Sequence, residues 1–180
     1  MTSFVALLRG INVGGRNKLP MADLRAIAAD CGFESPRTCI QSGNLVLEAH
    51  ASVEQVRTAL GEGIRERMGF DVPLAVRSGA DWRALVGGCP WPDAARDRDR
   101  QVHLGLATST APSGAEAALR EWAADGERVV VVGAAIWIDF AAGVARSKLT
   151  SARLDRAFSG IVTLRNHRTV LRITALLDEA

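Results

Sequence analysis

The stretch Thr38-Cys-Ile-Gln-Ser-Gly-Asn-Leu-Val-Leu47 decides the fold class of this sequence. Two short apolar segments, 38–41 and 44–47, flank Ser42-Gly43, a pair of residues typical of a tight turn. Such a short connection joins antiparallel strands, because a crossover between parallel strands needs roughly a dozen residues or more. The stretch therefore predicts a β-hairpin and argues against a doubly wound parallel sheet.

The segments on either side of this hairpin complete a β-α-β-β-α-β order. Ser52 and Gln55 have the spacing of a capping box, in which two side chains satisfy the first backbone groups of a helix. Pro20 is well placed at the start of a helix whose apolar residues recur with helical period. The expected strands are 3–8 and 72–77, and the expected helices are about 20–31 and 52–69.

The second half repeats this order and adds one helix. Gly133-Ala134 predicts a second hairpin turn, and Ser113 with Glu116 predicts a second capping box. We expect strands at 102–107, 128–132, 135–140 and 161–164, and helices at 113–126, 148–158 and 167–177. The order is that of an α+β protein with two tandem ferredoxin-like (βαββαβ) units, antiparallel sheets and a C-terminal helix. The units are expected at 1–86 and 101–180, joined by a linker at 87–100.

The composition narrows the possible functions. Among 180 residues there are 22 basic and 20 acidic ones, so any anion binding must come from local clusters of charge. The three cysteines, Cys31, Cys39 and Cys89, have neither zinc-site nor disulfide-framework spacing. We expect a cytoplasmic protein without metal or cofactor, because no stretch is long and apolar enough for a membrane span and the N-terminus is unlike a signal peptide.

Four segments resemble one family: Leu8 to Pro20, Cys39 to Val46, Arg146 to Leu149 and Thr163 to Val170. Together they are similar to the domain of unknown function 1697 family of uncharacterised bacterial proteins. The resemblance implies the tandem ferredoxin-like fold and no particular activity. Two positions depart from the family pattern, Cys39 in place of an aromatic residue and His167 in place of tryptophan, so a stacking role there does not carry over.

The glycines at 10 and 15 have the spacing of a phosphate-binding P-loop, but the rest of that motif is absent. Arg16 stands where the motif has lysine, and Asn17 where it has the hydroxyl residue that holds magnesium. A glycine-rich turn between strand and helix explains the segment better.

Basic residues gather at three expected helix starts, where the helix dipole is already positive. One interpretation is that a bound anion relieves this repulsion. The other is that these arginines are exposed and screened by salt, so that their repulsion has little effect on stability. The candidate ligand-binding residues are Arg9, Asn12, Arg16, Asn17, Lys18, Gln41, Ser42, Asn44, Arg146, Ser147, Lys148, Arg165, Asn166 and His167.

Three classes of function fit these features. The first is a module that binds a phosphate-containing small molecule or a nucleic acid through basic helix starts. The second is an enzyme acting on a small anionic substrate, although no catalytic residue is evident from spacing. The third is a protein-interaction module. Nothing in the sequence suggests binding to a membrane or a particular oligomeric state.

Overall fold

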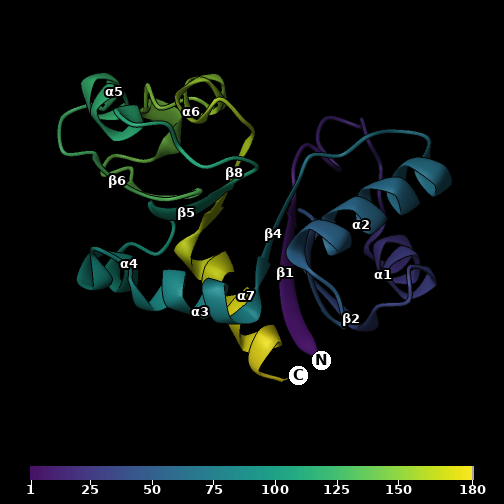
Figure 1. Cartoon of the computed structure of the whole chain (residues 1–180). Coiled ribbons are helices and arrows are strands. Elements are labelled where there is room, and N and C mark those ends of the chain that lie inside the picture. The colour runs from purple at the N-terminus through teal and green to yellow at the C-terminus, as the bar shows by residue number, and fades with distance from the viewer. Residues whose placement is uncertain (180) are drawn as a thin grey trace. The chain divides into compact units, whose positions relative to one another are not determined.

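The computed structural model describes residues 1–179 and contains two four-stranded antiparallel sheets with α-helices, an α+β fold (Figure 1). The chain forms two compact units. The first unit comprises Met1–Ala84 and the residues from Arg172 onward, and the second unit comprises Leu85–Leu171. The C-terminal residues therefore group with the first unit, whereas the sequence led us to expect one continuous segment from 101 to 180.

The first unit follows the expected order of elements. Its sheet has the strand order β2-β3-β1-β4, and every neighbouring pair is antiparallel. The elements are β1 (Thr2–Leu8), α1 (Met21–Asp30), β2 (Glu34–Cys39), β3 (Asn44–Ala49), α2 (Val53–Met68), β4 (Leu74–Ser78) and the start of α3 (Gly79–Gly87). The capping box at the start of α2 is confirmed, since Ser52 and Gln55 bond each other's backbone N–H groups.

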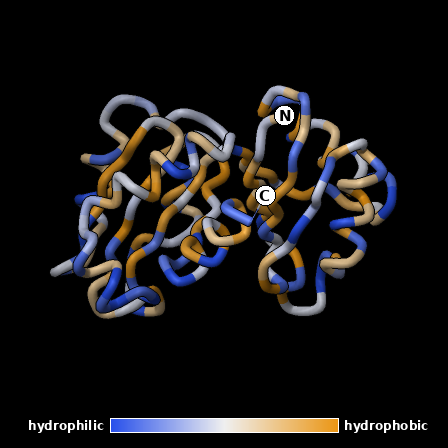
Figure 2. Tube along the Cα trace, turned by 90° about the horizontal axis from the view of Figure 1, so that it is seen from below, coloured by the Kyte–Doolittle hydropathy of each residue, from blue (hydrophilic) through white to orange (hydrophobic). Residues whose placement is uncertain are grey.

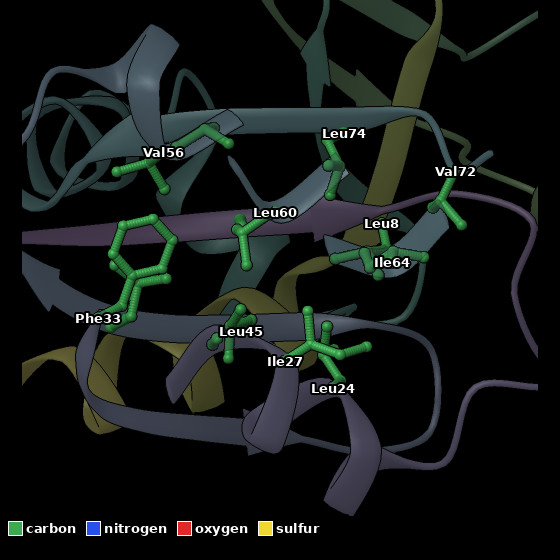
Figure 3. Close-up of a cluster of buried hydrophobic side chains, with 14 of the residues drawn as sticks. Leu8, Leu24, Ile27, Phe33, Leu45, Val56, Leu60, Ile64, Val72 and Leu74 are labelled. Carbon is green, nitrogen blue, oxygen red and sulfur yellow. The ribbon is translucent and has the colours of Figure 1, made fainter. Parts of the chain in front are cut away.

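The core of the first unit lies between its sheet and the helices α1 and α2. Figure 3 shows Ile27 of α1 and Leu60 of α2 among the side chains that meet Leu8 and Leu45 of the sheet. Burial of these apolar side chains is the main stabilising contribution to the unit.

The other face of the first sheet is also covered. Val5 and Leu7, which alternate with the core residues of β1, are 0% exposed. The final turns of α7 (His167–Asp178) belong to this unit and bond α3: Trp82 Nε1 donates to Thr174 Oγ1 at 2.9 Å, and Arg83 pairs with Asp178 at 2.9 Å. These contacts explain why the C-terminal residues group with the N-terminal ones.

The second unit repeats the topology of the first, with the strand order β6-β7-β5-β8. Its core lies between the sheet and two short helices, and Leu119, Leu154 and Phe158 of these helices are fully buried. The elements are α4 (Pro92–Asp97), β5 (Val102–Ala107), α5 (Ala115–Trp122), β6 (Arg128–Val132), β7 (Ala135–Asp139), the 3₁₀ turn η1 (Val144–Arg146), α6 (Ser151–Phe158), β8 (Val162–Asn166) and the start of α7.

The fourth strand of each sheet leads into a helix in the same way. Arg77 of β4 and Arg165 of β8 each donate to the carbonyl oxygen of the preceding residue, at 2.7 and 2.9 Å. The next residues, Ser78 and Asn166, each accept a bond from the backbone N–H three residues on, at 3.1 and 2.9 Å. Such bonds cap helix starts, so each unit carries an additional capped helix after its fourth strand.

Two expected features differ from the structure, one because of a longer-range side-chain bond and one because of backbone conformation. Ser113 and Glu116 form no capping box: α5 follows Gly114, whose φ is +87°, and Glu116 bonds the Val131 N–H instead. The first strand of the first hairpin spans Glu34–Cys39 and not 38–41, since Ile40 has a φ of +52° and leaves the strand.

Two further corrections concern the second half. The helix expected from 148 begins at Ser151, because Thr150 is its N-cap and accepts from the Arg153 N–H at 3.4 Å. The segment 87–100 contains the helix α4, which begins with Pro92 at its first position. The hairpin turn at Gly133 is confirmed by its φ of +57°.

Hydrophobic stretches of the chain are short and alternate with hydrophilic ones (Figure 2). Within residues 1–179, no helix has the length and apolar character that a membrane crossing requires.

Asp139, at the end of β7, is a buried carboxylate held by two arginines. Arg98 and Arg128 each approach its Oδ2, at 2.7 and 2.6 Å, and the Ala141 N–H donates to Oδ1 at 3.1 Å. Burial alone would raise the pKa of Asp139, but the bonds from Arg128 and Arg98 outweigh it and hold the pKa below its usual value. The carboxylate therefore stabilises the folded state when it is ionised.

We predict that Asp139→Asn lowers the free energy of unfolding at pH 7 by about 1–3 kcal/mol, because two arginines lose their counter-charge. The folded-state pKa of Asp139 lies below the unfolded value of about 3.9. Its ionised carboxylate therefore stabilises the fold fully above about pH 3.9, and this stabilisation is lost as pH falls through the folded-state pKa. Urea unfolding at pH 7 and melting temperatures between pH 5 and 2 measure this. The exposed Asp125→Asn is the control. An equal effect of both variants at pH 7 would contradict the prediction.

Candidate functional site

The segment from Arg9 to Pro20, which we call the basic loop, connects β1 to α1. Its backbone is held in an unusual conformation, with a positive φ at Gly10, Asn12, Gly14, Gly15 and Asn17. Glycine adopts this region freely, and asparagine tolerates it better than most other residues. The glycines and asparagines of the motif are therefore explained by the shape of the loop.

Asn12 holds the basic loop in place. Its Nδ2 donates to the carbonyl oxygens of Leu19 and Gln41, both at 2.9 Å, and its Oδ1 accepts from the Leu19 N–H at 2.9 Å. Asn17 adds a weaker bond, from Nδ2 to the Gly10 carbonyl at 3.2 Å. These candidate ligand residues thus use their amides within the protein.

The tip of the first hairpin lies beside the basic loop. The Leu8 N–H donates to the Gly43 carbonyl at 2.8 Å, and a Cβ at Gly43 would lie 2.6 Å from that of Leu8. Asn44 is 1% exposed and donates to the Cys39 carbonyl at 2.8 Å, so its side chain does not reach the surface. Gln41 is exposed and Ser42 is half-buried.

Two exposed cations precede α1. Within residues 1–179, the side chains of Arg16 and Lys18 make neither a hydrogen bond nor an ion pair. Arg9 is half-buried at the beginning of the loop, and its backbone N–H bonds the Pro73 carbonyl at 3.1 Å. The basic loop therefore presents Arg16 and Lys18 to solvent.

The start of α1 is not capped by a side chain. Pro20 is the N-cap, and the first helical bond runs from the Leu24 N–H to the Pro20 carbonyl at 3.0 Å. The backbone N–H groups of residues 21–23 therefore have no partner within the helix. Asp23 lies in the first turn and offsets part of the positive potential. Asp23 is not among the residues predicted for the site, although an acidic residue in a first turn is a recognisable signal.

The start of α6 is basic but capped. Arg146 and Lys148 are exposed, and Ser147 Oγ accepts from the Leu149 N–H at 2.9 Å. The Lys148 carbonyl accepts a bond from Arg153 Nη1 at 3.1 Å. With Thr150 as the N-cap, one of the backbone donors that an anion would need is already occupied.

The start of α7 is satisfied within the protein. Asn166 is its cap, and Arg168 pairs with Asp99 at 2.8 Å. Burial lowers the pKa of Arg165 to about 10. Its half-buried side chain is not a freely exposed cation.

His167 packs into the second unit. Its ring lies 6.2 Å from that of Trp137 and bonds the backbone of Ala95, while its Nδ1 is buried without a hydrogen-bond partner in residues 1–179. Burial lowers the pKa of His167, despite the opposing effects of the Ala95 bond and of Asp99. An uncharged, packed imidazole suits a structural role.

The candidates form a separate set in each unit. Those of the first unit meet where β1 ends beside the hairpin tip. In the second unit, Arg146, Ser147 and Lys148 lie after β7, which ends at Asp139. Arg165 and Asn166 end β8, and Asn166 pairs with His103 near the start of β5. Among residues 1–179, no three His, Cys, Asp or Glu side chains gather as metal ligands would.

Comparison with known proteins gives a family and a fold. No curated protein matches the chain. A solved structure, that of the conserved bacterial protein SP0830 from Streptococcus pneumoniae, is similar with a TM-score of 0.70 over 98% of both chains. Its sequence identity is 23%, so the similarity concerns the fold.

The family model described as "Protein of unknown function (DUF1697)" matches residues 1–137. This range includes the basic loop and the first hairpin, and it ends before the other two resembling segments, 146–149 and 163–170. The match spans well over half of the sequence, and the chain therefore belongs to the DUF1697 family.

Proposed function

We propose that the basic loop and the start of α1 bind a phosphate-containing ligand, either a small molecule or a nucleic acid. The observation that carries the proposal is the combination of unpaired Arg16 and Lys18 side chains with an uncapped helix start. Unpaired backbone N–H groups and nearby cations are the features with which helix starts bind phosphate. Lysine contributes a compact charge and arginine a forked donor.

The loop suits this function because its shape is fixed before a ligand arrives. Asn12 ties Leu19, next to the helix start, to the hairpin tip at Gln41. Arg16 and Lys18 lie between the points held by Asn12, so their backbone loses little freedom on binding. Preorganisation of this kind increases affinity by lowering the entropy cost of binding.

The other two basic helix starts support the proposal less. α6 has a side-chain cap at Thr150, and α7 has one at Asn166. The Arg168 charge at the start of α7 is already balanced by Asp99. We therefore place the principal site in the first unit and treat Arg146 and Lys148 as a separate, weaker anion site of the second unit.

The fold proposal follows from topology. If the strands of each unit are numbered one to four along the chain, both sheets have the order 2-3-1-4 with all neighbours antiparallel. This is the strand order of a ferredoxin-like sheet. We propose that the chain consists of two such units in tandem. Such sheets often bind RNA by stacking bases on aromatic side chains, but only 5% of residues are aromatic and none is tyrosine, which favours contacts to phosphate.

We also propose a cytoplasmic location. Cys31, Cys39 and Cys89 are all unpaired thiols, which fits a reducing compartment.

We predict that Lys18→Gln and Arg16→Gln each weaken the binding of inorganic pyrophosphate by about tenfold, because each removes one charged contact. Asp23→Asn strengthens binding, since it removes a carboxylate that competes with the anion. Isothermal titration at low salt measures the affinities. Arg100→Gln, which removes an exposed arginine of the second unit, is the charge-matched control.

A short thymidine oligonucleotide, titrated in parallel, separates the two ligand sources. Tighter binding of the oligonucleotide with a steep salt dependence indicates nucleic acid, and tighter binding of pyrophosphate indicates a small ligand. Equal losses for Lys18→Gln, Arg16→Gln and Arg100→Gln would leave only non-specific charge attraction and would refute the site. Turnover of a phosphate ester would identify the protein as an enzyme.

Asn12→Ala is predicted to lower the free energy of unfolding by about 1–3 kcal/mol and to weaken pyrophosphate binding, because three hydrogen bonds that shape the loop are lost. Asn17→Gly is the matched variant: glycine suits the φ of +48° at this position and only one bond is removed. Urea unfolding and the titration above measure both effects. If Asn12→Ala binds pyrophosphate as the wild type does, the shape of the loop is irrelevant to binding.

A further inference from the structure

The strand β6 forms one edge of the second sheet, since only β7 pairs with it. Its sequence is Arg128 followed by four consecutive valines, Val129–Val132. An edge strand presents unpaired N–H and C=O groups to other chains, and proteins usually protect it with lysine, proline or a bulge. The valine run of β6 has none of these.

The equivalent edge of the first sheet, β2, is protected in the usual way. It contains Pro36, which has no N–H to offer, and its register shifts between Glu34 and Arg37. The two units therefore differ at this position, and β6 requires another form of protection.

The outward-facing backbone groups of β6 belong to Val129 and Val131. Val132 pairs with Ala135 across the tight turn, and in an antiparallel pair alternate residues direct their backbone groups toward the partner strand. The backbone groups of residues 128, 130 and 132 therefore face β7. Val129 and Val131 direct two N–H and two C=O groups away from the sheet.

Two side chains of α5 occupy half of these groups. Glu116 Oε2 accepts from the Val131 N–H at 2.7 Å, and Arg120 Nη2 donates to the Val129 carbonyl at 3.3 Å. Arg120 also pairs with Glu116 at 2.6 Å, so that the two side chains form a continuous strap along the edge. An open hollow of about 420 Å³, lined in part by Trp91, Arg120 and Val130, lies beside the strand.

We propose that the Glu116–Arg120 strap prevents β6 from pairing with β6 of a second copy of this chain. Two antiparallel copies related by a two-fold axis at Val130 place Val129 opposite Val131 of the other copy. All four outward groups of each strand then form hydrogen bonds, and valine packs against valine across the pair. The strap supplies an acceptor and a donor at the positions that the second strand would use.

The test compares the double variant Glu116→Ala/Arg120→Ala with the wild type in sedimentation and in amide hydrogen exchange. We expect the average mass of the double variant to rise with concentration above that of the wild type. The decisive readout is the Val129 N–H, which becomes protected from exchange as concentration increases. General unfolding would leave this amide unprotected, and aggregation of unfolded chains would not be reversed by dilution, whereas pairing of folded copies is.

Three further variants complete the design. Glu116→Gln keeps an acceptor for Val131 and is expected to behave as the wild type, and Glu121→Ala, an exposed position on the same helix, is the control. Val132→Lys added to the double variant places lysine opposite Arg128 of the second copy and is expected to restore the wild-type mass. A double variant with unchanged mass and unprotected Val129 overturns the proposal, as does association that persists after Val132→Lys.

Discussion

The inner strands of each four-stranded sheet must be covered on both faces, and the rest of the structure depends on this constraint. Residues 4–8 of β1 are all buried, as are Leu104 and Leu106 of β5 with their neighbours Ala107 and Trp137. A sheet covered by two helices on one face leaves the other face in water, where such apolar strands would be costly. Each unit therefore needs further helical cover.

The additional helices provide this cover and begin in the same manner in both units. Arg77 and Arg165 bond the carbonyl of the preceding residue at the end of a fourth strand, and a capping residue follows each of them. Within the second unit, buried Ala95 of α4 and the His167 ring on Trp137 contribute to the same face. The basic residues at the start of α7 are thus largely part of the fold, whereas the Arg16 and Lys18 side chains of the basic loop have no hydrogen bond or ion pair within residues 1–179.

Features that depend on neighbouring residues were predictable from the sequence. The two hairpins, the capping box of Ser52 and Gln55, and the order of elements in both halves follow from local spacing. Glu116 shows where this approach fails, because a glutamate three residues after a serine predicts a cap, whereas its carboxylate bonds Val131 on a strand that lies later in the chain. The prediction for Asn44 was wrong for a similar reason: its polarity suggested a ligand contact, whereas the fold buries its side chain. Local pattern does not reveal a partner that is distant in sequence.

The most direct measurement of the proposed function is a crystal structure of the protein with inorganic pyrophosphate at saturating concentration. We expect the anion to lie against Lys18 Nζ and the backbone N–H groups of residues 21–23, with Arg16 turned toward it and with the Asn12 bonds to Leu19 and Gln41 unchanged. Pyrophosphate bound only elsewhere, or a basic loop that remains empty at saturation, would contradict the proposed site.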